Sequence, residues 1–243
     1  FVAKLDANDI SEDEAARTLR ASALDTMLAA DNPAVQASWR ALVSQHPADK
    51  AIALVQELLH DKAKLNAASL RYGDTAALRT ALATRTQCDL QQTPDDLVRA
   101  FCTAPRLPDA LCAAWQEALL KTNKADATAV LHQWRTQAPD ERAKHFATYQ
   151  KLFLTNKGTV QANLLTKAQE ALAPTGLRAA LEAEAEAVLR LVQYRQRQNR
   201  ALMTAAILEC GLALQQAYDA AKERAAALDF DDVIAHTANL LEQ

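Results

Sequence analysis

The feature that most constrains this fold is a stretch of some fifty residues that holds almost no helix breaker. From residue 177 to residue 226 the chain has no proline and one glycine, Gly211. Apolar residues recur there at helical spacing, at Leu177, Leu181, Val188 and Leu191 and then at Leu202, Ala205, Leu208 and Leu212. This predicts one very long helix over 177–226, roughly 75 Å at about 1.5 Å per residue. Such a helix extends beyond a single core or connects two bodies.

The rest of the composition also favours helices. Of the 243 residues, 50% are hydrophobic, 5% are aromatic and four are glycine. Alanine and leucine supply most of the apolar side chains, and both lose little entropy in a helix. Three helix starts are marked by a capping residue, alone or before proline: Ser11, Asn32–Pro33 and Thr93–Pro94. We expect an all-α, multi-helix fold, and no segment reaches the roughly 20 apolar residues of a membrane span.

One segment departs from the helical pattern. Residues 151–160 combine β-branched and aromatic side chains with the sequence Asn156-Lys157-Gly158. Because glycine readily adopts positive φ, a short turn or hairpin is expected near 153–160.

Charge is distributed unevenly along the chain, whose net charge is −3. Residues 1–60 hold five basic and nine acidic residues, whereas residues 118–170 hold eight basic and four acidic residues. A polyanion is therefore expected to meet the second region. We expect two parts, an N-terminal helical subdomain, 1–116, and a basic helical region, 117–243, that contains the long helix and a terminal helix.

Sequence signatures of an intrinsic active site are missing. The chain has no phosphate-binding G-x-x-x-x-G-K-[ST] loop, no H-E-x-x-H and no G-x-S-x-G. Its five histidines lack metal-ligand spacing, and its four cysteines form no C-x-x-C pair. We expect these cysteines to be reduced and mostly buried in a cytoplasmic protein. No catalytic residue, metal ligand or cofactor is predicted within the chain.

An acidic cluster close to the end of the chain allows two interpretations. Asp229, Asp231 and Asp232 surround Phe230 and precede an apolar helical stripe. The plainer interpretation is helix capping, with Asp229 or Asp231 as the cap and Asp232 in the first turn, where negative charge suits the helix dipole. The alternative is a metal-dependent enzymatic site made by the three aspartates. The strong apolar stripe also indicates a partner surface outside the chain.

The same cluster carries a family resemblance. Residues 228–234, Leu-Asp-Phe-Asp-Asp-Val-Ile, resemble the L-D-F-D-D-L-[IL] segment that precedes the Walker B motif of UvrD-like superfamily 1 helicases. Residues 149–167 are similar to the AddA subunit of bacterial AddAB helicase–nucleases, and residues 1–28 to the stretch after the early helicase motifs. The similar residues of the middle segment are Tyr149, Phe153, Leu154, Thr155, Gly158, Leu165, Thr166 and Lys167.

The resemblance implies that the chain is the helical 1B insertion of such a helicase. The parent would then be an ATP-dependent 3′→5′ DNA helicase and exonuclease of double-strand-break repair, in the bacterial cytoplasm and associated with the nucleoid. ATP and Mg belong to that parent, with the Walker A lysine upstream of this piece and the Walker B acids downstream. The implied partners are duplex DNA, an AddB-type partner subunit and the parent's own ATPase domain, with no membrane.

In that family the insertion contacts duplex DNA ahead of the unwinding fork, for which a few cations near phosphates are enough. The candidate DNA-binding residues are Lys151, Lys157, Lys167, Arg195, Arg197 and Arg200. The plainer reading of these cations is a solvated helix surface. Many relatives carry an arginine three residues after the turn glycine, where this chain has Gln161. The alternative function is a protein–protein docking module, in which the long helix and the acidic residues 1–60 bind the partner subunit.

Overall fold

The computed structural model describes residues 2–103 and 106–225, and within these ranges the chain forms α-helices, one 3₁₀ helix and no β-strand. The expected all-α fold is confirmed. None of the helices in this part is long and apolar enough to cross a bilayer. The helices are α1 (Val2–Ala29), α2 (Pro33–Gln45), α3 (Ala48–Glu57), η1 (Leu58–Asp61), α4 (Lys62–Tyr72), α5 (Thr75–Thr86), α6 (Pro94–Thr103), α7 (Asp109–Lys121), α8 (Ala125–Thr136), α9 (Pro139–Lys144), α10 (Phe146–Gln150), α11 (Lys167–Leu172) and α12 (Leu177–Ala225).

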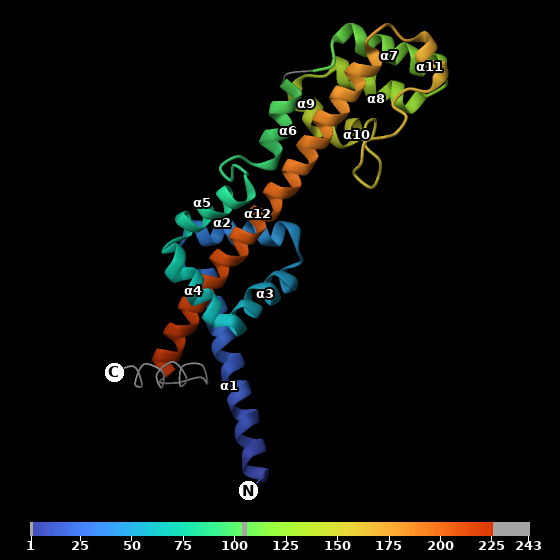
Figure 1. The fold of residues 1–243 in the computed structure, drawn as a ribbon. Coiled ribbons are helices and arrows are strands. Elements are labelled where there is room, and N and C mark those ends of the chain that lie inside the picture. The colour runs from blue at the N-terminus through green and yellow to red at the C-terminus, as the bar shows by residue number, and fades with distance from the viewer. Residues whose placement is uncertain (1, 104–105, 226–243) are drawn as a thin grey trace. The chain divides into compact units, whose positions relative to one another are not determined.

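The described residues form two compact units (Figure 1). Unit 1 contains the described residues up to Arg85 and those from Leu202 onward, and unit 2 contains Thr86–Ala201. Helix α12 therefore contributes its first half to unit 2 and its second half to unit 1. The division expected after residue 116 is not where the units separate, because that position lies inside α7 and within unit 2. A division of the sequence into consecutive stretches cannot describe unit 1, because its residues come from two segments that are far apart in the chain.

The predicted long helix is confirmed, since α12 has 49 residues. Gly176 immediately precedes it with a φ of 91°, a conformation that glycine adopts at no steric cost. The start at Asn32 is also confirmed, because its side chain accepts hydrogen bonds from two backbone N–H groups of α2. Ser11, by contrast, lies inside α1, so the helix start predicted there is wrong. No proline or glycine separates Val2 from Ser11, and nothing stops the helix from beginning earlier.

Each unit has its own hydrophobic core. In unit 1, Leu42 of α2 and Leu214 of α12 are completely buried in a cluster with residues of α1 and α3. The core of unit 2 is aromatic: Trp134 stacks on Tyr149 with ring centroids 3.6 Å apart, and the Phe153 ring lies 5.1 Å from that of Tyr149. Burial of side chains of this size stabilises the fold by about 1.5–3 kcal/mol each. The aromatic cluster therefore holds α8, α10 and the chain that follows α10 together.

Helix α12 meets η1 at Gly211. A Cβ atom added there would lie 2.5 Å from Leu58 Cδ1, nearer than such atoms approach in proteins. A glycine inside a helix costs about 1 kcal/mol relative to alanine. At this position the missing side chain lets Leu58 pack against the helix, so the glycine has a packing role in unit 1.

Candidate nucleic-acid interface

The candidate interface is built on the turn that follows α10, visible as the yellow loop in Figure 1. Leu154 pairs with Val160 in one antiparallel β-bridge. The Thr155 N–H donates to the Thr159 carbonyl at 2.8 Å, and the Gly158 N–H donates to the Thr155 carbonyl at 2.9 Å. Gly158 has a φ of 75°, which a residue with a side chain rarely adopts. The predicted short hairpin is therefore present, as a single bridged turn.

The two ends of the turn are anchored in the core of unit 2. Phe153 and Leu154 lead into it and are 0% and 3% exposed, and Leu165 on its far side is 3% exposed. Because these three side chains are packed in the aromatic core, the exposed tip between them has a defined position within unit 2.

The start of α11 is held in a similar way. Thr166 and Gln169 form a capping box, in which each side chain bonds the backbone N–H of the other residue. Gln169 is 3% exposed, and its Nε2 also donates to Thr122 Oγ1 at the end of α7, at 2.9 Å. Lys167, the first residue of α11, therefore stands on a helix that is fastened to α7.

Three candidate lysines lie on the surface of this anchored segment. Lys151, Lys157 and Lys167 are exposed, and none of them forms an ion pair with a described residue. Lys157 occupies the tip of the turn, Lys151 follows α10 just before the turn, and Lys167 is the first residue of α11 after it. No acidic side chain of the described residues therefore neutralises their charges.

Other cations of the basic region 118–170 are already engaged. The ion pairs are Lys121–Glu117 at 2.7 Å, Arg135–Asp109 at 2.9 Å and Lys144–Glu141 at 2.6 Å. In each pair the hydrogen bond from the cation lowers the pKa of the carboxyl group. Arg142 donates to two backbone carbonyls instead. The cations of the region that form no ion pair with a described residue are therefore the three candidate lysines, the exposed Lys124 and Arg142.

Gln161 closes the turn. Its side-chain Nε2 donates to the Lys151 carbonyl at 2.7 Å, and its backbone N–H donates to the Phe153 carbonyl at 2.8 Å. The amide stabilises the turn but adds no charge, so contact with an anion at this place would have to come from the lysines.

The candidate arginines of α12 differ from the lysines because they have partners in the chain. Arg195 pairs with Asp95 of α6 at 3.4 Å. The Arg197 guanidinium lies 5.8 Å from the centre of the Tyr194 ring. Arg200 is exposed, and it too interacts with another group of the protein. The six candidates therefore do not form one site.

A residue between these arginines has a role that the sequence did not reveal. Gln198 is completely buried, and its Nε2 donates to the carbonyls of Asp89 and Gln92, both at 2.7 Å. The polar run in α12 thus fastens the segment that precedes α6. A glutamine among charged residues gives no signal of this in the sequence.

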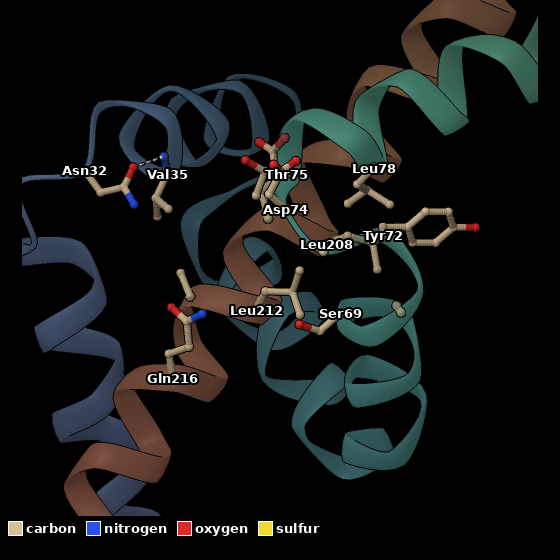
Figure 2. Close-up of a pocket in the computed structure, with 14 residues that line it drawn as sticks. Asn32, Val35, Ser69, Tyr72, Asp74, Thr75, Leu78, Leu208, Leu212 and Gln216 are labelled. Carbon is tan, nitrogen blue, oxygen red and sulfur yellow. Dashed lines mark hydrogen bonds between the residues drawn. The ribbon is translucent and has the colours of Figure 1, made fainter.

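A cavity of about 280 Å³ lies in unit 1, between the start of α2, the α4–α5 turn and α12 (Figure 2). Its lining includes the apolar Val35, Leu78 and Leu212 and the acids Asp74 and Glu209. Both acids are committed to the fold. Asp74 caps α5, whereas Glu209 accepts hydrogen bonds from Ser38 and, at 2.5 Å, from Arg79 Nε.

The remaining predictions concern metal and thiol chemistry. The residues Asp229, Phe230, Asp231 and Asp232 lie outside the described residues, so capping and metal binding both stay predictions. Within residues 2–103 and 106–225 no cluster of three His, Cys, Asp or Glu side chains could hold a metal ion. The four cysteines are free and buried, as expected. Burial raises the pKa of Cys102 and of Cys112 to about 11 and that of Cys210 to about 12.

Comparison of the chain with protein-family models, with curated proteins and with solved structures returns no match in any of the three. Function therefore has to be argued from the residues themselves.

Proposed function

We propose that this chain is a DNA-contacting accessory domain, of the 1B kind, in a UvrD-like helicase–nuclease of the AddA type. In this proposal the domain holds duplex DNA ahead of the unwinding fork and catalyses no step. ATP and Mg act in the parent's ATPase domain, which other residues of the parent supply. The parent works at the nucleoid in the bacterial cytoplasm, where it repairs double-strand breaks.

One observation carries this proposal: three exposed lysines without a described acidic partner stand on a single anchored segment. Lys151, Lys157 and Lys167 are each placed by buried neighbours, so the position of their charges is defined by the core of unit 2. Phosphate contacts of this kind orient a protein on DNA and carry no sequence preference. A domain that must hold any duplex needs no more than that.

The residues of the family resemblance support the proposal in a second way. Phe153 and Leu165 are the buried anchors of the turn, Gly158 provides its positive φ, and Thr166 caps α11. The resemblance thus falls on residues that give the turn its shape, and Lys167 belongs to the same pattern.

The proposal predicts that charge reversal at the three lysines weakens duplex binding. Wild-type affinity near physiological salt is expected to be low, about 10⁻⁴ M, so binding is best measured by fluorescence anisotropy at low salt. Reversing Lys151, Lys157 and Lys167 to glutamate should make the negative slope of log affinity against log salt shallower by about 3, since each lost phosphate contact removes about 0.9 from its magnitude.

A matched control is a triple reversal of lysines that already have acidic partners. Lys64, Lys121 and Lys144 pair with acids at 2.7, 2.7 and 2.6 Å, and their reversal to glutamate changes the net charge equally. The control should affect duplex binding much less. Equal losses in the two triple variants would show a non-specific effect of net charge, and an unchanged affinity in the first variant would end the DNA-contact assignment.

A second candidate function is docking of the partner subunit, which the cavity of Figure 2 favours. Its apolar lining suits an apolar segment of a partner, whereas Asp74 and Glu209 are already bound by groups of unit 1. Cross-links from residues 1–60 to a partner protein, without DNA cross-links to residues 118–170, would favour docking over DNA contact.

The identity of the parent can be examined independently of binding. The proposal requires a GKT-type phosphate loop encoded upstream of this chain and a D-E-x-Q-D acid pair encoded downstream. A gene that lacks either motif would contradict the helicase assignment while leaving the DNA-binding test intact.

A further inference from the structure

Unit 2 holds a second concentration of positive charge, apart from the turn. A groove of about 520 Å³ lies between α6 and the first half of α12, which run side by side in Figure 1. Three arginines, Arg106, Arg190 and Arg197, line it together with the aromatic side chains Phe101 and Tyr194. None of the described residues that line the groove is acidic.

Another cavity of unit 2 shows how cations are neutralised elsewhere. It is lined by residues of α6, α9 and α12, including two arginines and two aspartates that pair with them. Arg99 lies 3.0 Å from Asp140, and Arg195 lies 3.4 Å from Asp95. In the groove, by contrast, the one ion pair between described residues is a 3.4 Å contact of Arg190 with the exposed Glu186. Two of the three groove arginines, Arg106 and Arg197, thus form no ion pair with a described residue.

Two of the groove arginines lie against aromatic rings. The Arg106 guanidinium is 5.4 Å from the centre of the Phe101 ring, and that of Arg197 is 5.8 Å from the centre of the Tyr194 ring. The Tyr194 hydroxyl accepts the Asp89 N–H at 2.8 Å, which holds this ring in place. A guanidinium that lies on an aromatic ring can still donate hydrogen bonds, because its N–H groups point outward in the guanidinium plane. Nucleic-acid bases stack both on guanidinium planes and on aromatic rings.

We propose that this groove binds a single strand of nucleic acid, with phosphates at the three arginines and bases against the planar surfaces around Phe101 and Tyr194. Proteins that bind single strands combine a cationic groove with aromatic side chains in this way. An acidic peptide would match the charges, but it would leave the planar surfaces unused. The inference goes beyond the proposed duplex contact, because it concerns another surface and another form of DNA, and it does not depend on that proposal.

The test uses the full chain and a labelled oligothymidylate of about 20 nucleotides, whose binding is followed by anisotropy over a range of salt concentrations. Replacing Arg106, Arg190 and Arg197 with alanine is expected to weaken binding about tenfold or more. The negative slope of log affinity against log salt should become shallower by about 2, because each phosphate contact contributes about 0.7 to its magnitude with single strands. Phe101→Leu should weaken binding by about fivefold, and an abasic strand of equal length should bind the wild-type chain more weakly by a similar factor.

The matched control replaces Arg40, Arg71 and Arg85 with alanine. These three arginines are exposed in unit 1, and Arg71 lies 5.6 Å from the Tyr72 ring, so the control removes equal charge and one similar cation–ring pair. Strand binding that falls as much in the control as in the groove variant would overturn the proposal. So would an abasic strand that binds as tightly as oligothymidylate, or polyglutamate that binds in the groove more tightly than either. Duplex binding reports on the lysines and strand binding on the groove arginines, so the two proposals can fail separately.

Discussion

At the scale of single residues, two glutamates of α12 are buried almost equally but have different surroundings. Glu209 is 2% exposed and is bound by Arg79, a cation. Glu184 is 3% exposed and accepts one hydrogen bond, from the Tyr149 hydroxyl at 2.9 Å, while its second carboxyl oxygen bonds no described residue. An anion in such a place is poorly compensated. Burial therefore raises the pKa of Glu184 above its ordinary 4.5.

This arrangement predicts that stability falls as pH rises above about 4.5. In that range the unfolded chain releases the Glu184 proton while the folded chain keeps it, so the free energy of unfolding declines until the raised pKa is passed. The decline is at most about 1.4 kcal/mol per pH unit. Glu184→Gln cannot ionise and should lose this component, as urea unfolding between about pH 4 and pH 8 would reveal.

Glu186→Gln is the matched control, because Glu186 lies on the same helix but is exposed. It should keep the wild-type decline. A Glu184→Gln variant whose stability declines with pH as steeply as that of the wild type would contradict the buried, protonated state.

At the scale of elements, helix α12 is continuous because no residue in it forbids helix, yet its packing depends on the residue with the poorest helix propensity. Gly211 lets η1 approach so closely that a Cβ atom would meet Leu58. Helix propensity and packing therefore oppose each other at this position. Propensity can be predicted from the sequence, whereas the contact with η1 depends on residues more than a hundred positions away.

The opposition can be measured with a double-mutant cycle. In the wild-type background Gly211→Ala should give less than the gain of about 1 kcal/mol that helix propensity provides, because Leu58 must move. In a Leu58→Ala background the same substitution should give nearly the full gain. Equal effects of Gly211→Ala on the free energy of unfolding in both backgrounds would show that the close approach has no energetic weight.

At the scale of the whole molecule, each unit contains its own core, and the described residues that form the core of unit 2 all lie within Thr86–Ala201. Unit 1 is formed by described residues that precede unit 2 in the sequence and by described residues that follow it. The segment 86–201 is therefore an inserted body with an independent core, and its helices need no residue of unit 1 to bury their apolar faces.

A chain of residues 86–201 alone is predicted to fold. Trp134 stacked on Tyr149 should give it a near-ultraviolet circular dichroism signal, and its urea unfolding should be a single cooperative transition. Trp134→Leu, which removes the stacked pair, is the control for the origin of that signal. A fragment with helical far-ultraviolet signal but no near-ultraviolet signal would show that its core requires unit 1.

Whether a feature could be predicted from the sequence depends on how far apart in the chain its interacting residues are. Features set within a few residues were predicted, among them α12, the cap at Asn32 and the turn at Gly158. Features set by distant partners were not: Gln198 binds Asp89 across 109 positions, and Glu209 binds Arg79 across 130. The same distinction applies to the candidate DNA-binding residues. The exposure of the lysines follows from their local pattern, but the ion pair of Arg195 depends on Asp95 of α6, 100 positions away in the chain.

The position of α12 at the end of the described chain has a consequence for synthesis on the ribosome. Both cores lack the residues of α12 until this helix emerges from the ribosome. Its first half, which belongs to unit 2, emerges before its second half. The helices α1–α5, although translated first, therefore receive their last neighbour after the inserted body has received its own. Throughout the translation of Thr86–Ala201 the apolar side chains of α1, α2 and α3 that pack on α12 lack that partner, and transiently exposed apolar surface of this kind favours aggregation.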